Sequence, residues 1–172
     1  MDKKALILLV SIFFVTGCVT QPERYQTKSG KPEIIINAPL DEVKEVIISA
    51  YLSDGWSIVN DTQYSTSFLK PCGDGFSCIM GQALIGNSYS TPPNFELSMS
   101  WIKVDGGIKV MVSSYNLSTQ MAFGQVNRSS LMTNNNSFNQ IVDSLRTFKE
   151  GLEKDDTSLE QDKPFSFSEG NN

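Results

Sequence analysis

Few side chains in this sequence have types and spacings that could do chemistry. Its 172 residues include no histidine, and imidazole supplies the base of Ser-His-Asp and Cys-His nucleophiles and the commonest zinc ligand. Ser67 and Lys70 stand at the spacing at which, on a helix, a lysine amine can activate a serine hydroxyl. The residues around Ser67 and Lys70 favour a strand, however. The carboxylates of Asp41, Glu42 and Glu45 are a further candidate, but no apolar residues surround them to raise the pKa of one of these groups. We therefore expect no catalytic residue, no metal site and no cofactor: the protein is predicted not to be an enzyme.

The N-terminal segment is typical of a processing signal. Lys3 and Lys4 precede an apolar run over residues 5–15 that only Ser11 interrupts. At about 1.5 Å per residue such a run spans about 17 Å as a helix, less than the roughly 30 Å of a bilayer core, so a permanent transmembrane helix is not expected. A generic signal peptide or a short buried helix would leave the cysteine at its end, Cys18, unexplained.

Val15-Thr16-Gly17-Cys18 resembles the lipobox of bacterial lipoprotein precursors. The resemblance implies that residues 1–17 are cleaved as a signal peptide and that Cys18 becomes an acylated, palmitate-bearing first residue. Several acyl chains, at about 0.8 kcal/mol per buried CH₂ group, make such an anchor effectively permanent. Because Val19 stands where an aspartate commonly signals retention in the inner membrane, the resemblance favours the outer membrane, facing the periplasm, over the inner membrane or a Gram-positive cell surface.

The two remaining cysteines, Cys72 and Cys78, are predicted to form a disulfide. They flank a glycine-containing loop, Gly-Asp-Gly-Phe-Ser, and the envelope outside the inner membrane is oxidising. A redox or metal-binding pair is the alternative, but CxxC spacing is absent and no histidine can complete a zinc site.

Charge excludes one class of partner. The chain has 14 Lys and Arg against 19 Asp and Glu, a formal net charge of −5. No broad basic surface is therefore available to displace counterions from a nucleic-acid backbone, and nucleic acid is not an expected partner.

The chain divides into one folded domain with an appendage at each end. Residues 18–31 are polar and follow neither hydrophobic period, which predicts a flexible tether. Residues 32–154 are expected to form a single domain. Residues 155–172 are acidic and are predicted to be a disordered tail, in which Phe165 and Phe167 could alternatively serve as a short recognition segment.

Hydrophobic periodicity places the elements that would position any site. Residues 33–37 favour a strand and residues 40–51 an amphipathic helix, followed by strand signals over 56–60 and 65–69. Residues 94–117 alternate apolar and polar side chains on both sides of Asp105-Gly106-Gly107, which predicts a hairpin with one buried face. A last helix is expected through residue 152, capped by Ser137 or Asn139.

This order predicts an α+β two-layer sandwich, a mainly antiparallel sheet with about two helices on one face. Residues 34–61, beginning Ile-Ile-Ile-Asn-Ala-Pro, are also similar to the start of helix-grip and related small envelope lipoprotein domains. That similarity covers about thirty residues; it implies a style of fold and transfers no functional residue.

Residues 119–136 are rich in Ser, Thr, Asn and Gln, which predicts a loop or a polar edge strand. Apolar residues within it suggest a contact surface for another envelope protein, with candidate residues Gln120, Met121, Phe123 and Gln125; an ordinary loop is the alternative. The leading hypothesis is thus a lipid-anchored, non-enzymatic interaction or accessory module. The alternative is a carrier of an apolar small molecule or lipid, in a cavity lined by Trp56, Phe95, Met99 and Trp101.

Overall fold

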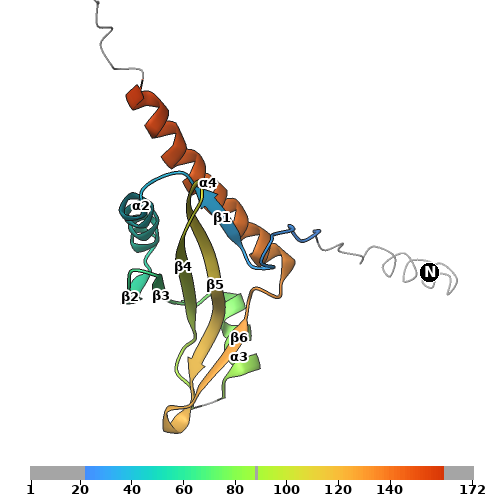
Figure 1. Ribbon diagram of the computed structural model, residues 1–172. Helices are drawn as coiled ribbons and strands as arrows, with labels where there is room; N and C mark the ends of the chain where they lie inside the picture. Colours follow the sequence, from blue (N-terminus) through green and yellow to red (C-terminus); the bar gives the residue numbers. More distant parts are fainter. Residues whose placement is uncertain (1–21, 88, 161–172) are drawn as a thin grey trace, which may run out of the picture.

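The computed structural model describes residues 22–87 and 89–160 as one α+β domain with a six-stranded antiparallel sheet (Figure 1). The predicted fold class is confirmed. Its elements in chain order are β1 (Glu33–Ile36), α2 (Leu40–Ser53), β2 (Ser57–Asp61), β3 (Ser65–Pro71), α3 (Phe76–Ile85), β4 (Asn94–Val104), β5 (Gly107–Gln120), the 3₁₀ turn η1 (Ala122–Gly124), β6 (Val126–Ser130) and α4 (Asn135–Glu160).

The sheet is organised around the long strand β5. Its strand order is β1-β5-β4-β3-β2, and β6 also pairs with β5. The first part of β5 pairs with β1 and the last part with β6, so these two short strands share one edge of β5. The polar edge strand predicted within residues 119–136 is therefore β6. It lies along the same edge of β5 as β1 but pairs with a later part of that strand.

The predicted β4–β5 hairpin is confirmed. Val104 pairs with Gly107, and the turn between them needs glycine because Gly106 and Gly107 have φ angles of 86° and 129°. A Cβ atom on Gly107 would lie 2.1 Å from the backbone oxygen of Ile36. The close approach of β1 to this turn thus depends on a bare glycine.

A bulge in β5 changes which residues face the helices. Met99 of β4 pairs with Val112, but the preceding Ser98 pairs with Ser114. Ser113 is therefore an extra residue in β5. Val112 and Tyr115 consequently both lie on the helix-covered face. This change of parity is what aims Tyr115 toward the helices.

The helices cover one face of the sheet. Side chains of α2, α4 and the sheet's inner face form one hydrophobic core, which includes Ile36, Val43, Ile47, Phe68, Leu97, Met99, Trp101, Val110, Val112, Leu145 and Leu152. Farther along β5, Gly81 of α3 lies against Leu117. Helix α3, between the two predicted helices, was not predicted. Its apolar residues follow no helical period, so the sequence does not set a polar face apart from an apolar one.

Helix α4 begins earlier and ends later than predicted. Its N-terminus is capped by Asn134, whose side-chain oxygen accepts from the backbone N–H groups of Asn136 and Ser137, rather than by Ser137 or Asn139. The helix continues to Glu160, so the prediction of a disordered tail is wrong for residues 155–160. Residues 161–172, with Phe165 and Phe167, lie outside the described residues.

The segment 22–31 has no helix or strand but packs against α4, which corrects the prediction of a flexible tether in this stretch. Asn139 of α4 accepts from the backbone N–H of Tyr25 at 2.9 Å and donates to the carbonyl of Glu23 at 2.8 Å. The Arg24 guanidinium lies 3.8 Å from the centre of the buried Phe138 ring. Polar composition predicted the lack of secondary structure here, but not that α4 would satisfy the backbone.

Candidate functional site

The disulfide predicted between Cys72 and Cys78 is present, and it positions α3. Cys72 directly follows β3, and Cys78 lies in the first turn of α3, with their Cα atoms 5.7 Å apart. The bond therefore ties the start of α3 to the end of a core strand.

Helix α3 packs closely on one side and is bare on the other. A Cβ atom on Gly81 would lie 2.3 Å from the side chain of Leu117, so glycine permits the close approach of α3 to β5. At the helix C-terminus, the Asn127 amide of β6 donates to the carbonyl of Ile85 at 2.8 Å. Ile79 and Leu84 remain 58% and 79% exposed on the outer side.

The four predicted partner-binding residues lie together at the turn between β5 and β6. Gln120 ends β5, and the backbone N–H of Met121 donates to the carbonyl of Gln125 at 2.6 Å, which closes the turn. Phe123 at its tip is fully exposed and has a φ angle of 67°, a left-handed conformation that is costly for a bulky residue.

This turn and α3 lie at the same end of the molecule (Figure 1). We call their exposed apolar side chains the α3–turn surface, which consists of Ile79, Met80, Leu84, Tyr89, Phe123 and Val126. No lysine or arginine occurs between Lys70 and Lys103 or between Lys109 and Arg128. The surface is therefore apolar and has no cation of its own.

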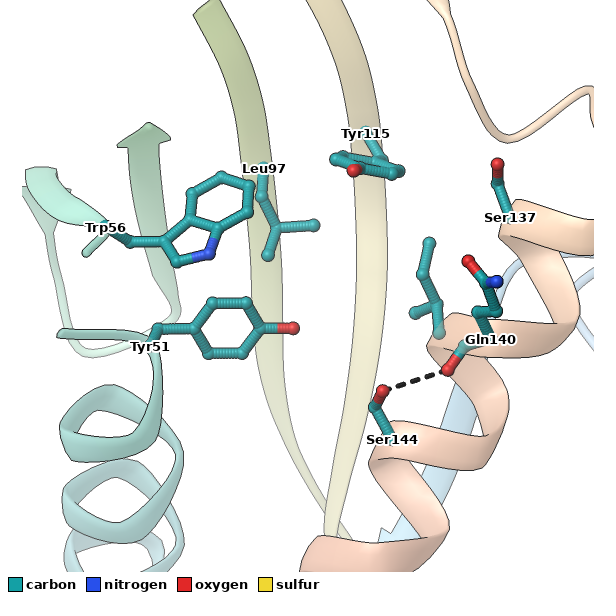
Figure 2. Close-up of a pocket in the computed structure, with 8 residues that line it drawn as sticks. Tyr51, Trp56, Leu97, Tyr115, Ser137, Gln140 and Ser144 are labelled. Atoms are coloured by element: carbon teal, nitrogen blue, oxygen red, sulfur yellow. Dashed lines mark hydrogen bonds between the residues drawn. The ribbon is translucent and has the colours of Figure 1, made fainter. Parts of the chain in front are cut away.

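A second candidate site is a cleft of about 170 Å³ between α2, the sheet and α4. Figure 2 shows Tyr51, Trp56 and Tyr115 on one side and side chains of α4 on the other. We call it the aromatic cleft; its lining is Tyr51, Trp56, Leu97, Tyr115, Ser137, Gln140, Ile141 and Ser144. A second hollow of about 190 Å³ shares Tyr51 and Ser144 with it, so the two form a groove between α2 and α4.

The aromatic cleft corrects the predicted cavity. Of the four residues expected to line it, only Trp56 does so, because Met99 and Trp101 are 0% and 2% exposed within the packed core. Phe95 stands behind the lining, where its ring stacks on Tyr115 at 6.0 Å between centroids. Tyr115 could not be expected there from alternation alone, since the bulge reverses its face.

The two tyrosines of the cleft remain uncharged donors. Burial raises the pKa of Tyr51 far above its usual value, and the neighbouring Tyr115 and Asp54 add to the effect; burial also raises the pKa of Tyr115. Among the residues described, none forms a hydrogen bond with either phenol hydroxyl. Both hydroxyls are thus free to donate to a bound molecule.

The indole of Trp56 is held in place by an ion pair beside the cleft. Its Nε1 donates to Asp54 at 3.1 Å, and the Lys70 amine donates to the same carboxylate oxygen at 2.8 Å. These two bonds hold the pKa of Asp54 below its ordinary value. Lys70 is therefore engaged on the helix-covered face, whereas the hydroxyl of Ser67 contacts that of Ser98 on the opposite face. The Ser-x-x-Lys spacing brings no catalytic pair together.

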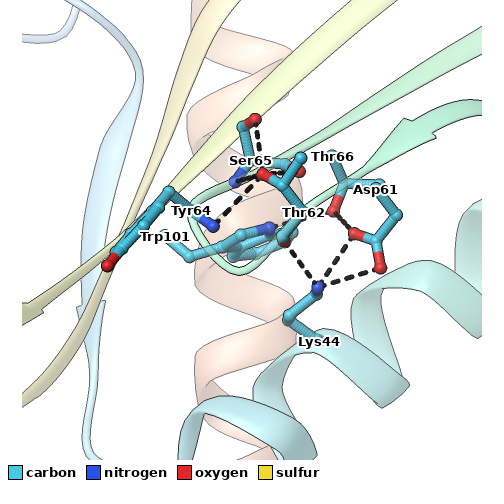
Figure 3. A network of polar contacts seen from close by, with 7 residues as sticks. All are labelled: Lys44, Asp61, Thr62, Tyr64, Ser65, Thr66 and Trp101. Carbon is cyan, nitrogen blue, oxygen red and sulfur yellow. Dashed lines mark hydrogen bonds and ion pairs between the residues drawn. The ribbon is translucent and has the colours of Figure 1, made fainter.

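A polar network fastens α2 to the β2–β3 hairpin (Figure 3). Lys44 of α2 lies 2.8 Å from Asp61, which also accepts from the hydroxyl of the fully buried Thr66. The same hydroxyl accepts from the indole of Trp101 at 2.9 Å. The Lys44 and Thr66 donors hold the pKa of Asp61 below its ordinary value. We interpret the network as structural, because every member is satisfied within it.

The described residues contain neither a membrane-spanning helix nor a cluster of metal-ligating side chains. No helix within residues 22–160 combines the length and apolar character needed to cross a membrane. The same residues contain no group of three or more cysteine, aspartate or glutamate side chains placed to hold a metal ion. Cys18, the predicted lipidation site, and residues 1–17 lie outside the described part of the chain.

Comparison of this chain with protein-family models, curated proteins and solved structures gives no match. Function must therefore be argued from the two surfaces themselves.

Proposed function

We propose that the protein is a lipid-anchored, non-enzymatic envelope module that binds another protein through the α3–turn surface. One observation carries the proposal: Phe123 is fully exposed in a left-handed backbone conformation at the tip of the β5–β6 turn. Residues held in sparsely populated conformations cluster at sites that recognise ligands. The prediction that Gln120, Met121, Phe123 and Gln125 contact a partner is part of this proposal.

The energetics of exposed apolar area support binding. Leu84, Tyr89 and Phe123 are at least 79% exposed, and removing such side chains from water contributes about 25 cal/mol per Å². Aromatic residues and methionine are enriched at protein interfaces and charged residues are depleted at their centres. The α3–turn surface has this composition.

The absence of cations favours a protein partner over the bilayer. Interfacial helices that lie in a membrane are rich in lysine and arginine, which attract anionic lipids. Helix α3 has neither residue, and neither has the turn at 121–125. A protein with an apolar groove or face is the better complement.

The docking of residues 22–31 on α4 supports action close to the membrane. Pro22 accepts a hydrogen bond from the Asn135 amide at 3.2 Å. Four Cα–Cα steps from residue 18 to residue 22 span at most about 15 Å even when extended. If Cys18 is acylated, residue 22 and the start of α4 are held within that distance of the bilayer surface, which favours a partner that is itself associated with the membrane.

Chemical crosslinking of the intact protein in its own envelope tests the proposal. We expect one specific protein adduct in wild type that is lost in the double variant Leu84→Ser, Phe123→Asn. Val59→Ser is the matched control, because Val59 is 65% exposed on the edge strand β2. Cys18→Ser should lose the adduct through release from the membrane. An adduct that survives in the double variant would overturn the proposed surface.

A further inference from the structure

The aromatic cleft has the features of a small-molecule site that is separate from the α3–turn surface. Its side chains come from three parts of the fold: the end of α2 with the following Trp56, the sheet, and the first half of α4. The Tyr51 and Trp56 rings meet edge to face at 5.6 Å, and Trp56 lies 6.5 Å from Tyr115. The rings therefore support one another, and the cleft wall is formed before any ligand arrives.

The hydroxyls of this wall are what distinguish it from core packing. Filling the space beside Leu97 requires only rings, as Phe68 and Phe95 show in the same aromatic cluster. Tyr51 and Tyr115 add hydroxyls that, within residues 22–160, have no hydrogen-bond partner. In Figure 2 the Tyr51 hydroxyl points into the space between the sheet and α4. Neither hydroxyl is among the fully buried polar atoms without a partner, so both are open to the cleft, where a ligand oxygen that accepts from them takes the place of water.

Size and charge restrict the ligand. A volume of about 170 Å³ is close to the roughly 150 Å³ of an engineered cavity that holds benzene. No charged side chain lines the cleft, so a charged ligand would lose hydration without gaining a counterion. The indole N–H of Trp56 is already engaged by Asp54, which leaves the phenol hydroxyls as the donors on this wall.

We infer that the aromatic cleft binds an uncharged molecule that inserts one six-membered ring between Trp56 and α4 and offers an acceptor oxygen to the hydroxyls of Tyr51 and Tyr115. This inference does not rest on the proposed partner binding. It replaces the broader alternative of a lipid carrier with a shallow site for one ring.

Acetophenone and ethylbenzene are suitable probes, because they differ mainly in a carbonyl oxygen. In an NMR titration of the folded protein, we expect millimolar binding of acetophenone, with shifts at the Trp56 indole and around Tyr115 and Gln140. Each hydrogen bond to the carbonyl oxygen should be worth about 2- to 10-fold in affinity, so ethylbenzene, which can accept neither, should bind at least about 2- to 10-fold more weakly. Shifts elsewhere on the protein, or equal affinity for both probes, would overturn the inference.

Conservative variants separate the hydroxyls from the rings. Tyr51→Phe and Tyr115→Phe should each weaken acetophenone toward the affinity of ethylbenzene and leave ethylbenzene unchanged. Tyr64→Phe is the matched control, because that ring is 70% exposed on another part of the surface. Ser144→Phe should fill the cleft and abolish binding of both probes. Unchanged acetophenone affinity in both Tyr51→Phe and Tyr115→Phe would contradict the assigned donors.

Discussion

Phe123 combines two features that folding alone would disfavour, a fully exposed aromatic ring and a φ angle of 67°. Asparagine tolerates the left-handed region better and has no ring to expose. We therefore expect Phe123→Asn to raise the free energy of unfolding by about 1 kcal/mol, a rise in Tm of about 2–6 °C for a domain of this size. Partner binding should fall in the same variant.

Thermal unfolding and envelope crosslinking of one sample check both effects. A variant that loses stability together with the adduct would indicate that Phe123 is structural. The α3–turn surface would then need a different centre.

Thr66 links a buried indole to an exposed carboxylate. Thr66→Val removes the hydroxyl that accepts from Trp101 and donates to Asp61. An orphaned buried donor costs about 1–3 kcal/mol, so urea unfolding should show a loss of that size. Thr66→Ser keeps the hydroxyl and should lose less. Equal losses in the two variants would mean that packing of the threonine methyl group, rather than the hydrogen bond, is decisive.

Asp61 should contribute to acid sensitivity. Because Lys44 and Thr66 hold its pKa below the ordinary 3.8, its ion pair stabilises the fold above about that pH and the contribution is lost as the pH falls through the lowered pKa. Asp61→Asn should therefore be less stable than wild type at pH 7, and the difference should shrink below pH 4. Urea midpoints measured from pH 7 to pH 2 test this, and a constant difference across that range would contradict it.

Among the elements, α3 depends most directly on a covalent link. Seven residues from Cys72 to Cys78 close the ring, for which chain entropy gives about 2.4 kcal/mol. Reduction should speed hydrogen exchange in α3 while amides of the β4–β5 hairpin stay protected, because the bond joins the first turn of α3 to the end of β3. Mass spectrometry of exchanged peptides measures this. Equal protection of α3 in both redox states would show that the contact of Gly81 with Leu117 suffices.

The elements also show what the sequence could and could not predict. The hairpin was predictable because Phe95, Leu97, Met99 and Trp101 alternate up to a glycine turn, and α4 was predictable because one stripe is apolar. In α3 only Ser77 and Gln82 are polar, so its sequence has no apolar period to detect. The bulge at Ser113 inserts one residue into an otherwise regular strand, and alternation alone cannot show where such an insertion falls.

The candidate sites were predictable to different degrees. The disulfide and the turn residues around Phe123 could be proposed from residue type and position. The aromatic cleft could not, because its wall joins residues from α2, β4, β5 and α4 that only tertiary packing brings together. Trp56 alone was anticipated there.

For the whole molecule, we propose two recognition surfaces on one small domain beside a predicted membrane anchor. The α3–turn surface lies at one end, and the segment that leads back toward Cys18 is docked on α4 (Figure 1). A partner is thus expected to meet the exposed apolar side chains of the α3–turn surface on a domain that stays near the bilayer. Removal of the anchor should weaken that encounter by dilution without changing the fold.

The most direct measurement of the central claim is site-specific photocrosslinking in intact envelopes. A benzophenone side chain is placed at position 123 in one sample and at position 59 in another, since Val59 is exposed on β2, which does not contribute to the α3–turn surface. We expect one discrete protein adduct from position 123 and none from position 59. Equal labelling from both positions, or adducts with lipid alone at position 123, would contradict this expectation.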